Sequence, residues 1–259
     1  MPYTLSHIAA VVPAYGPLSR ARVFSAAVIG SMVPDFGLML GGLARWQTHS
    51  LHALFTFCLP VGLAAYALTE WLIRPAVLEV LPDGAYTRLR AAGEPPPLHR
   101  PRHWLLVVGA LLFGALTHLI WDGFTHENAH GVRLFPELLA YGPEMAGHSL
   151  QLYRWAQYGS SVVGLVVVIA ALALWLHHAP APAPRPPRRL AAGERAFWLA
   201  AYLALPALLV AWVGWRSWAR AHGAPPLGTE LGLIGVTSLR AAALSLLLTS
   251  VLLRLRLAA

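Results

Sequence analysis

The sequence predicts an all-α protein, a polytopic helical membrane bundle of about five transmembrane helices plus a broken N-terminal helical segment. Of the 259 residues, 57% are hydrophobic and only 12% are charged, and the mean hydropathy is +0.57. Soluble domains usually carry about 25% charged residues, so a soluble fold of this length would lack polar surface to cover its core. Five apolar segments also reach the length of about 20 residues that a helix needs to cross a bilayer.

The apolar stretch 23–42 is the predicted broken segment. Pro34 and several glycines interrupt it and disfavour one continuous helix. We therefore expect helical pieces that pack against the bundle or re-enter the membrane. The five predicted spans follow in chain order: Leu51–Ile73, Trp104–Phe124, Gln157–Leu176, Ala196–Trp215 and Leu231–Leu253.

Two polar connectors separate the predicted spans. The connector from Leu81 to Arg102 contains three consecutive prolines and four arginines. The other, residues 179–195, is rich in proline and arginine, which is typical of a disordered linker. The predicted organisation is a three-span domain with the candidate metal site (1–178), this linker (179–195) and a two-span C-terminal hairpin (196–259).

All nineteen basic residues are arginines, and the formal net charge is +8. Because many of them lie in connectors beside apolar spans, membrane topology explains them better than nucleic-acid binding, which we do not expect. Basic loops on the cytoplasmic side would put residues 125–156 and the first 50 residues outside, although Arg20, Arg22 and Arg45 oppose this orientation. We expect an integral protein of the cytoplasmic membrane whose polar groups lie near the extracytoplasmic face.

The end of the second predicted span carries polar side chains in a stretch that is otherwise uncharged from Trp104 onward. At about 100° per residue, Asp122 lies about 40° round a helix from His118, and His126 about 80° round. If the helix continues that far, one stripe presents an imidazole, a carboxylate and a second imidazole. These groups are typical metal ligands at a helical spacing.

Other polar groups are expected to reach the same face of the membrane. His49 begins the first span, and antiparallel neighbours bring the start of one helix beside the end of the next. Each group has an ordinary alternative, as an interfacial histidine, a helix cap or a hydrogen-bonded pair between helices. Their coincidence at one face favours a metal site formed by His7, Asp35, His49, His118, Asp122 and His126.

Histidine and carboxylate ligands without cysteine suit zinc first, as one or two ions, with manganese or iron as alternatives. Paired ions clamp the attacking and leaving oxygens in phosphoester hydrolysis, and one of them activates water as the nucleophile. Glu127 is the side chain that we single out as a base, although a solvent-exposed loop glutamate is its ordinary interpretation.

Four more polar residues are considered as supports for the ligands or as substrate contacts. His130 and His148 lie in the loop on the same predicted side, and Gln157 begins the third span. Arg240 lies midway along the last span, where an unpaired charge costs about 2.5–3.5 kcal/mol. This arginine has three possible roles: it binds an anionic headgroup, it forms an ion pair with Glu230, or its side chain extends to the membrane interface.

A resemblance to a known family rests on the motifs MPYTLSH, GSMVPDF, THS, LPVGL, GALTHLIWDGFTH and QYGSS. Over about residues 1–170 the chain resembles a widespread bacterial membrane family known only as a domain of unknown function. That family resembles the membrane-bound metal-dependent hydrolases, and its ligand order is similar to that of zinc-dependent phospholipase C and the S1/P1 nucleases. The resemblance implies that the same six residues bind metal in a bacterial membrane. The pattern departs at His148, which is followed by Leu152 where those enzymes have glutamate, so it implies no third ion.

The predicted function is a membrane-bound metal-dependent hydrolase acting on a phosphoester, with membrane lipid as its surroundings and a lipid or lipid-phosphate as its substrate. The alternative is a non-catalytic polytopic membrane protein whose polar cluster is structural or binds or conducts a metal or another ion. A conduit would continue polar residues across the bilayer, whereas the spans beyond His49 and His118 are almost wholly apolar.

Overall fold

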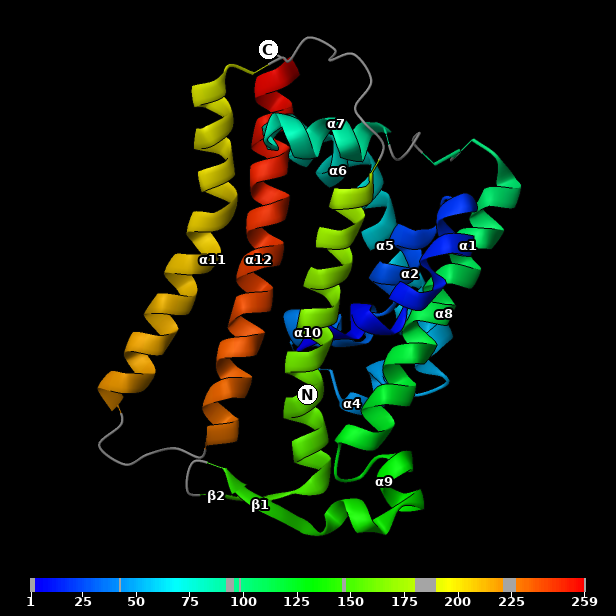
Figure 1. Ribbon diagram of the computed structural model, residues 1–259, viewed down its shortest axis with the longest axis vertical. Coiled ribbons are helices and arrows are strands. Elements are labelled where there is room, and N and C mark those ends of the chain that lie inside the picture. The colour runs from blue at the N-terminus through cyan, green and yellow to red at the C-terminus, as the bar shows by residue number, and fades with distance from the viewer. Residues whose placement is uncertain are drawn as a thin grey trace. The chain divides into compact units, whose positions relative to one another are not determined.

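The computed structural model of the chain describes residues 3–41, 43–91, 96–97, 99–145, 148–179, 190–220 and 227–258 (Figure 1). In these ranges the chain is almost entirely helical, which confirms the predicted fold class. Five helices of the described chain are long and apolar enough to cross a membrane: Leu54–Val80, Pro101–Thr125, Leu152–His178, Ala192–Arg216 and Gly235–Ala258.

The segment before the first span consists of short helices. They are η1 (Thr4–Ala10), η2 (Val12–Ala14), α1 (Tyr15–Arg20), α2 (Phe24–Gly30), η3 (Val33–Phe36), α3 (Gly37–Leu40) and α4 (Arg45–Thr48). The expected break in the stretch 23–42 is confirmed, since α2, η3 and α3 occupy it in turn. Pro34 stands within the first two residues of η3, where a missing amide hydrogen does least harm.

The first spanning helix changes its winding twice, each time just before a proline. Its parts are η4 (Leu54–Cys58), α5 (Leu59–Leu68), η5 (Thr69–Ile73) and α6 (Arg74–Val80), and both η4 and η5 are π-helical. Pro60 and Pro75 are the second residues of α5 and α6. A proline clashes with the carbonyl four residues earlier, and a wider turn relieves that clash. A further helix, α7 (Asp83–Ala91), occupies the connector that the sequence did not predict to be helical.

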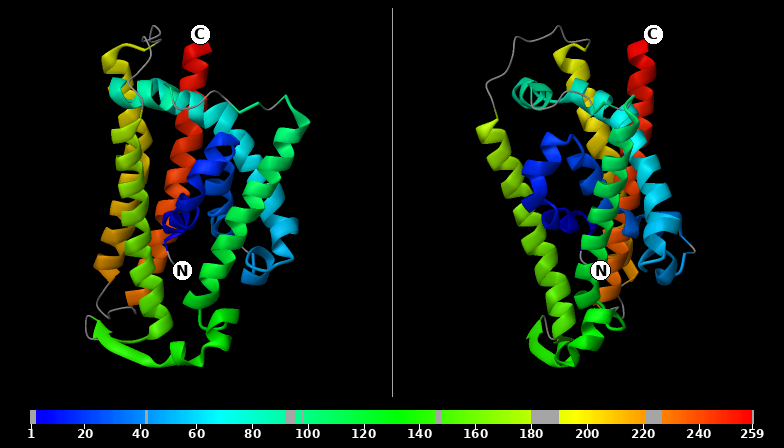
Figure 2. Two further views of the ribbon diagram at one scale, coloured as in Figure 1. Left: turned by 45° about the vertical axis from the view of Figure 1, so that its right-hand side comes forward. Right: turned by 90° about the vertical axis from the view of Figure 1, so that its right-hand side faces the viewer.

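The middle of the chain forms two long helices joined by a compact linking segment. The elements are α8 (Pro101–Thr125), α9 (His130–Leu134), η6 (Pro136–Leu139), β1 (Tyr141–Met145), β2 (His148–Gln151) and α10 (Leu152–His178). The antiparallel β1–β2 hairpin was not predicted, because its two short strands lack an alternating apolar pattern. In Figures 1 and 2 the N-terminal helices lie between α8 and α10.

Helices α2 and α8 approach each other closely through glycines. A Cβ atom on Gly30 would stand 2.2 Å from the carbonyl oxygen of Leu111, and one on Gly114 would stand 2.2 Å from that of Ala27. Small residues at such a crossing let two backbones touch. The contact carries the main apolar core, which includes Val33, Val107, Leu111 and Ala115.

Substituting Gly114 by alanine is therefore expected to separate α2 from α8 and destabilise the protein. Overpacking typically costs about 1–3 kcal/mol. Gly109 is the matched control, because it lies on the same helix and a Cβ there would meet nothing within 4 Å. Thermal unfolding followed by gel filtration should show an early transition for Gly114→Ala and a normal one for Gly109→Ala. Equal transitions would mean that the close crossing is not required.

The chain forms two compact units. The first contains residues 1–66 and 96–177, and the second contains residues 67–95 and 178–259. In the second unit α11 (Ala192–Arg220) and α12 (Leu227–Ala258) pair with each other and contact α6. The Tyr202 hydroxyl lies 2.9 Å from the Ser250 hydroxyl between the paired helices. Most of the predicted linker 179–195 lies outside the described residues.

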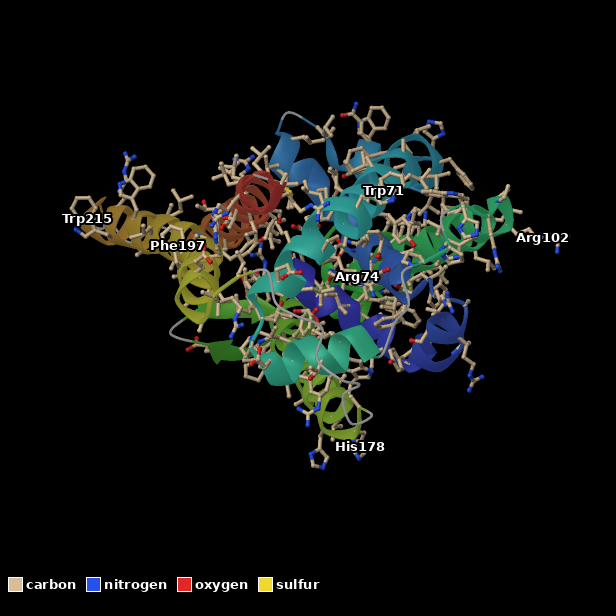
Figure 3. All side chains as sticks on the ribbon, turned by 90° about the horizontal axis from the view of Figure 1, so that it is seen from above. Trp71, Arg74, Arg102, His178, Phe197 and Trp215 are labelled. Carbon is tan, nitrogen blue, oxygen red and sulfur yellow. The ribbon has the colours of Figure 1, made fainter. Side chains whose placement is uncertain are left out.

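Apolar side chains point outward from α11, as expected for a helix surrounded by lipid. Phe197 and Trp215 are 65% and 61% exposed, and both are labelled on this helix in Figure 3. Between the paired helices, the buried Ser245 hydroxyl donates to the Tyr202 carbonyl at 2.8 Å. All six candidate ligands belong to the first unit.

Candidate metal centre

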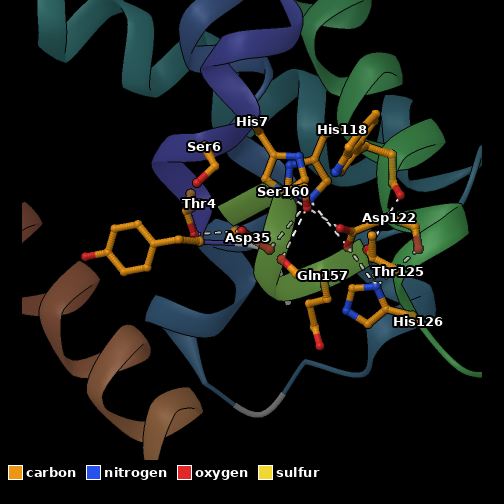
Figure 4. Close-up of polar contacts among 12 residues, drawn as sticks. Thr4, Ser6, His7, Asp35, His118, Asp122, Thr125, His126, Gln157 and Ser160 are labelled. Atoms are coloured by element: carbon orange, nitrogen blue, oxygen red, sulfur yellow. Dashed lines mark hydrogen bonds and ion pairs between the residues drawn. The ribbon is translucent and has the colours of Figure 1, made fainter. Parts of the chain in front are cut away.

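The six predicted ligands come together in one cluster within the first unit (Figure 4). η1 carries His7, η3 carries Asp35, and His49 directly follows α4. The buried residues are His7, Asp35, His118 and Asp122, while His49 and His126 are partly buried. The convergence of distant segments that the sequence predicted is therefore present in the structure.

His118 is oriented by the backbone of the α2–η3 turn. Its Nδ1 lies 2.7 Å from the carbonyl oxygen of Ser31, which can only accept, so Nδ1 carries the donated proton. A neutral ring then has its lone pair on Nε2. That atom lies 3.6 Å from Asp35 Oδ1 and 3.6 Å from Asp122 Oδ2. The close α2–α8 crossing thus aims an unprotonated nitrogen at two carboxylates.

His49 is oriented in the same sense by its neighbour Thr48. The Thr48 hydroxyl donates to the Arg45 carbonyl at 3.3 Å and lies 2.6 Å from His49 Nδ1. With its own proton used on the carbonyl, the hydroxyl oxygen accepts from Nδ1. The lone pair of His49 is then on Nε2, 3.4 Å from Asp35 Oδ1 and 3.5 Å from Asp122 Oδ2.

Other side chains also bind the two aspartates: Asp35 through the oxygen that faces away from the histidines, and Asp122 through an oxygen that faces them. The Thr4 hydroxyl donates to Asp35 Oδ2 at 2.7 Å, which turns Oδ1 towards the histidines. The Arg45 guanidinium donates to Asp122 Oδ2 at 2.9 Å. Burial by itself raises the pKa of Asp35, but the neighbouring rings of His49 and His118 outweigh it and lower that pKa overall. Asp35 is therefore an anion at neutral pH.

The separations within the cluster fit an ion better than hydrogen bonds. Two Nε2 atoms and two carboxylate oxygens, from His49, His118, Asp35 and Asp122, lie 3.4–3.6 Å apart across all four nitrogen–oxygen pairs. Charge-assisted hydrogen bonds are about 2.7–2.9 Å long. Ligand atoms on a tetrahedral zinc with bonds of about 2.0–2.1 Å are about 3.3 Å apart. The buried histidines and aspartates can therefore hold a metal ion, as two overlapping triads that share His118.

The cluster also contains an unusual number of buried polar atoms without a hydrogen-bond partner. In the described part of the chain these atoms are His7 Nδ1 and Nε2, Asp35 Oδ1, His49 Nε2, His118 Nε2, Asp122 Oδ1 and His126 Nε2. A buried polar atom left unpaired costs about 1–3 kcal/mol, so native proteins contain few of them. A cation at this place would satisfy several of these atoms at once.

His7 is held in the cluster by helix α10. The backbone N–H of Tyr3 donates to the Ser161 hydroxyl at 3.0 Å, and the Ser6 hydroxyl donates to the Ser161 carbonyl at 2.8 Å. The His7 ring stacks on His118 with centroids 3.7 Å apart, and its Nε2 lies 3.6 Å from Asp122 Oδ1. Burial lowers the pKa of His7 to about 4. The ring is thus neutral at pH 7, so a proton does not compete with a metal ion for its nitrogen atoms.

His126 joins the cluster by a different route from the one expected. The helix ends at Thr125, and His126 has an extended backbone, so the three residues do not share one helical stripe. Instead, the ring turns back, and Nδ1 lies 3.1 Å from the Asp122 carbonyl oxygen, an acceptor that the helix end leaves free. Burial lowers the pKa of His126 to about 4, which keeps this ring neutral as well.

The weaker candidates lie around the cluster or outside it. Glu127 is exposed, with Oε2 3.5 Å from the Tyr153 hydroxyl, and His130 is exposed at the start of α9. Gln157 is buried on α10 beside the cluster in Figure 4. Its backbone carbonyl accepts from the hydroxyls of Ser160 and Ser161. His148 lies in β2, and its side chain is outside the described residues. Arg240 lies on α12 in the second unit, and Glu230 is on the same helix with its side chain outside the described residues.

Four supporting groups were missed by the sequence analysis, namely Thr4, Ser31, Arg45 and Thr48. Thr4, Ser31 and Thr48 stand within one to four residues of a candidate ligand, inside the motifs YTLSH, GSMVPDF and THS. Thr4 and Thr48 could therefore have been predicted from their position close to candidate ligands in the sequence. Ser31 acts through its carbonyl, which no side-chain pattern reveals.

Comparison with known proteins adds a family but no activity. A family model described as a domain of unknown function, DUF4184, matches residues 1–251. No curated protein and no solved structure matches the chain. The family match extends beyond the expected limit near residue 170 and takes in most of the C-terminal helix pair.

Proposed function

We propose a function for this chain, which belongs to the DUF4184 family: it is a membrane-bound, metal-dependent hydrolase that cleaves a phosphoester. One observation carries the proposal. Four acceptor atoms of His49, His118, Asp35 and Asp122 face one another at 3.4–3.6 Å, with the histidine protons used elsewhere. A cation between these atoms would offset the repulsion among them.

A purely structural cluster is the competing explanation, and the hydrogen-bond inventory argues against it. Polar networks that tie helices together normally satisfy every buried member. Here seven buried nitrogen and oxygen atoms of the six candidate ligands lack a hydrogen-bond partner in the described residues. An ion conduit is disfavoured too, because the apolar side chains of Val107, Leu111 and Ala115 fill the core beside the cluster.

Zinc is the ion that we propose, as one or two ions, with manganese and iron as alternatives, because the donors are imidazoles and carboxylates. When bound, such an ion polarises a phosphoryl oxygen and makes hydroxide available near neutral pH. His49, His118, Asp35 and Asp122 would hold the first ion. His7 and His126 supply further neutral imidazoles for a second ion or for the substrate. The ligand order of zinc-dependent phospholipase C and the S1/P1 nucleases, inferred from sequence, agrees with this assignment.

A lipid-linked substrate is proposed because large apolar side chains within nine residues of His49 in the chain are exposed. Leu40, Trp46, Leu51 and Phe55 are each between 63% and 70% exposed. In a membrane protein such side chains contact acyl chains, so a lipid phosphate could reach the cluster from the bilayer. We place the protein in the bacterial cytoplasmic membrane with this site near the extracytoplasmic face.

Hydrolysis by the purified, zinc-loaded protein tests the proposal. In mixed micelles, phosphatidic acid and a phosphodiester lipid should be cleaved faster than the water-soluble p-nitrophenyl phosphate. Activity should disappear with a chelator and return with zinc. Zinc-loaded protein that hydrolyses none of these substrates would contradict phosphoester hydrolysis, while equal rates would contradict only the preference for lipid.

A further inference from the structure

Arg45 lies at the edge of the candidate metal centre with one end inside it. Its side chain is 43% exposed, whereas its partner Asp122 is 2% exposed. The guanidinium therefore reaches from the surface to a buried carboxylate, and a terminal nitrogen donates to Oδ2 at 2.9 Å. Exposed apolar residues flank it on both sides, with Leu43 before it and Trp46 after it.

The Asp122 oxygen that Arg45 contacts also faces the histidines. Oδ2 lies 3.5 Å from His49 Nε2 and 3.6 Å from His118 Nε2, so it belongs to the four atoms that would surround an ion. An ion on that oxygen and the guanidinium would share one carboxylate charge. Two positive groups so close repel each other at low dielectric, and the weaker of the two bonds yields.

We infer that Arg45 binds the phosphate group of the substrate, and that an ion on Asp122 releases its guanidinium for this purpose. This inference rests on the proposed function. Before its release, the guanidinium nitrogen lies no more than about 5 Å from the ion, because the 2.9 Å contact and an ion–oxygen bond of about 2 Å share one oxygen. One phosphate group can span that interval with one oxygen on each cation. The planar guanidinium also matches two phosphate oxygens, which an ammonium group does not.

The phosphate could come from a lipid headgroup or from free phosphate in solution. The cluster itself recognises the same chemistry in both cases. The exposed Leu43 and Trp46 beside Arg45 favour a phosphate that carries acyl chains. Inorganic phosphate and short-chain dihexanoyl phosphatidic acid distinguish the two sources, because only the second can use the apolar rim.

The test measures zinc binding and phosphate binding separately by calorimetry on the full-length protein in detergent. Arg45→Met keeps most of the aliphatic stem and removes the charge, while Arg45→Lys keeps the charge and removes the planar fork. Arg20→Met is the matched control, since Arg20 is exposed on α1 and is not part of the cluster. Normal gel-filtration profiles establish that each variant is folded.

Arg45→Met should bind zinc as tightly as the wild type or more tightly. With zinc bound, it should bind both phosphate ligands about 10–100-fold more weakly, as expected for loss of a charged hydrogen bond. Arg45→Lys should fall between the two, and Arg20→Met should match the wild type. Unchanged phosphate affinity in Arg45→Met overturns the inference, and so does loss of zinc binding, which would make Arg45 a positioning residue for Asp122. If the wild type binds no zinc, the proposed function fails and takes this inference with it.

Discussion

Asp122→Asn is expected to abolish phosphoester hydrolysis, with a loss of about a thousand-fold or more, because the ion supplies several kcal/mol of transition-state stabilisation. Asp122 stands at the centre of the cluster, and its two oxygens lie within 3.6 Å of nitrogens on His7, His49, His118 and His126. An amide has the same shape but carries no negative charge. The rate of lipid-phosphate hydrolysis at saturating zinc is the measurement.

Asp83→Asn provides the control for that substitution. The chain contains three aspartates, and Asp83 is the one outside the cluster, on α7 of the second unit. The same chemical change there should leave hydrolysis within about twofold of the wild type. Full activity in Asp122→Asn would contradict the role assigned to Asp122 and would favour a structural hydrogen-bonding cluster, which tolerates an amide.

Zinc is expected to stabilise the folded protein strongly. Ligand at about 1,000 times its dissociation constant adds about 4 kcal/mol to the free energy of unfolding. The effect should be large because zinc would bind buried atoms that lack hydrogen bonds, including His118 Nε2 and Asp35 Oδ1. Thermal unfolding in detergent, with and without zinc, should show a rise on the order of 10 °C in the wild type.

The same experiment on His118→Ala and His52→Ala separates site binding from surface binding. His118 is fully buried in the cluster, whereas His52 is exposed near the start of the first span. The rise with zinc should vanish in His118→Ala and persist in His52→Ala. An equal rise in both variants would assign the stabilisation to surface histidines.

The fold was predictable because a membrane imposes simple requirements on a sequence. A continuous apolar run must become a helix, so all five spans were predicted from Leu51, Trp104, Gln157, Ala196 and Leu231 onward, and the described helices confirm them. Helices outside the spans were less predictable, because they need no apolar run. Helix α7, which begins at Asp83, lies in a polar connector. The β1–β2 hairpin is stabilised by pairing that no local pattern indicates.

The site was predictable as a set of residues but not as a geometry. His118 and Asp122 share a helix face, and the start of the first span brings His49 beside them, as expected from antiparallel packing. The position of His126 was predicted for the wrong reason. The helix does not continue to this residue, and its ring instead contacts the carbonyl oxygen of Asp122 in the last turn. The contribution of Ser31 depends on a backbone carbonyl brought close by Gly30 and Gly114, a tertiary contact that spacing cannot reveal.

The metal content of the purified protein tests the central claim most directly. The wild type and a His118→Ala/Asp122→Ala double variant would be purified without chelator and analysed by elemental mass spectrometry. We predict close to one or two equivalents of zinc, or of manganese or iron, in the wild type and almost none in a double variant that remains folded. A wild type without metal, even after reconstitution with zinc, would contradict a metal centre and leave a structural polar cluster.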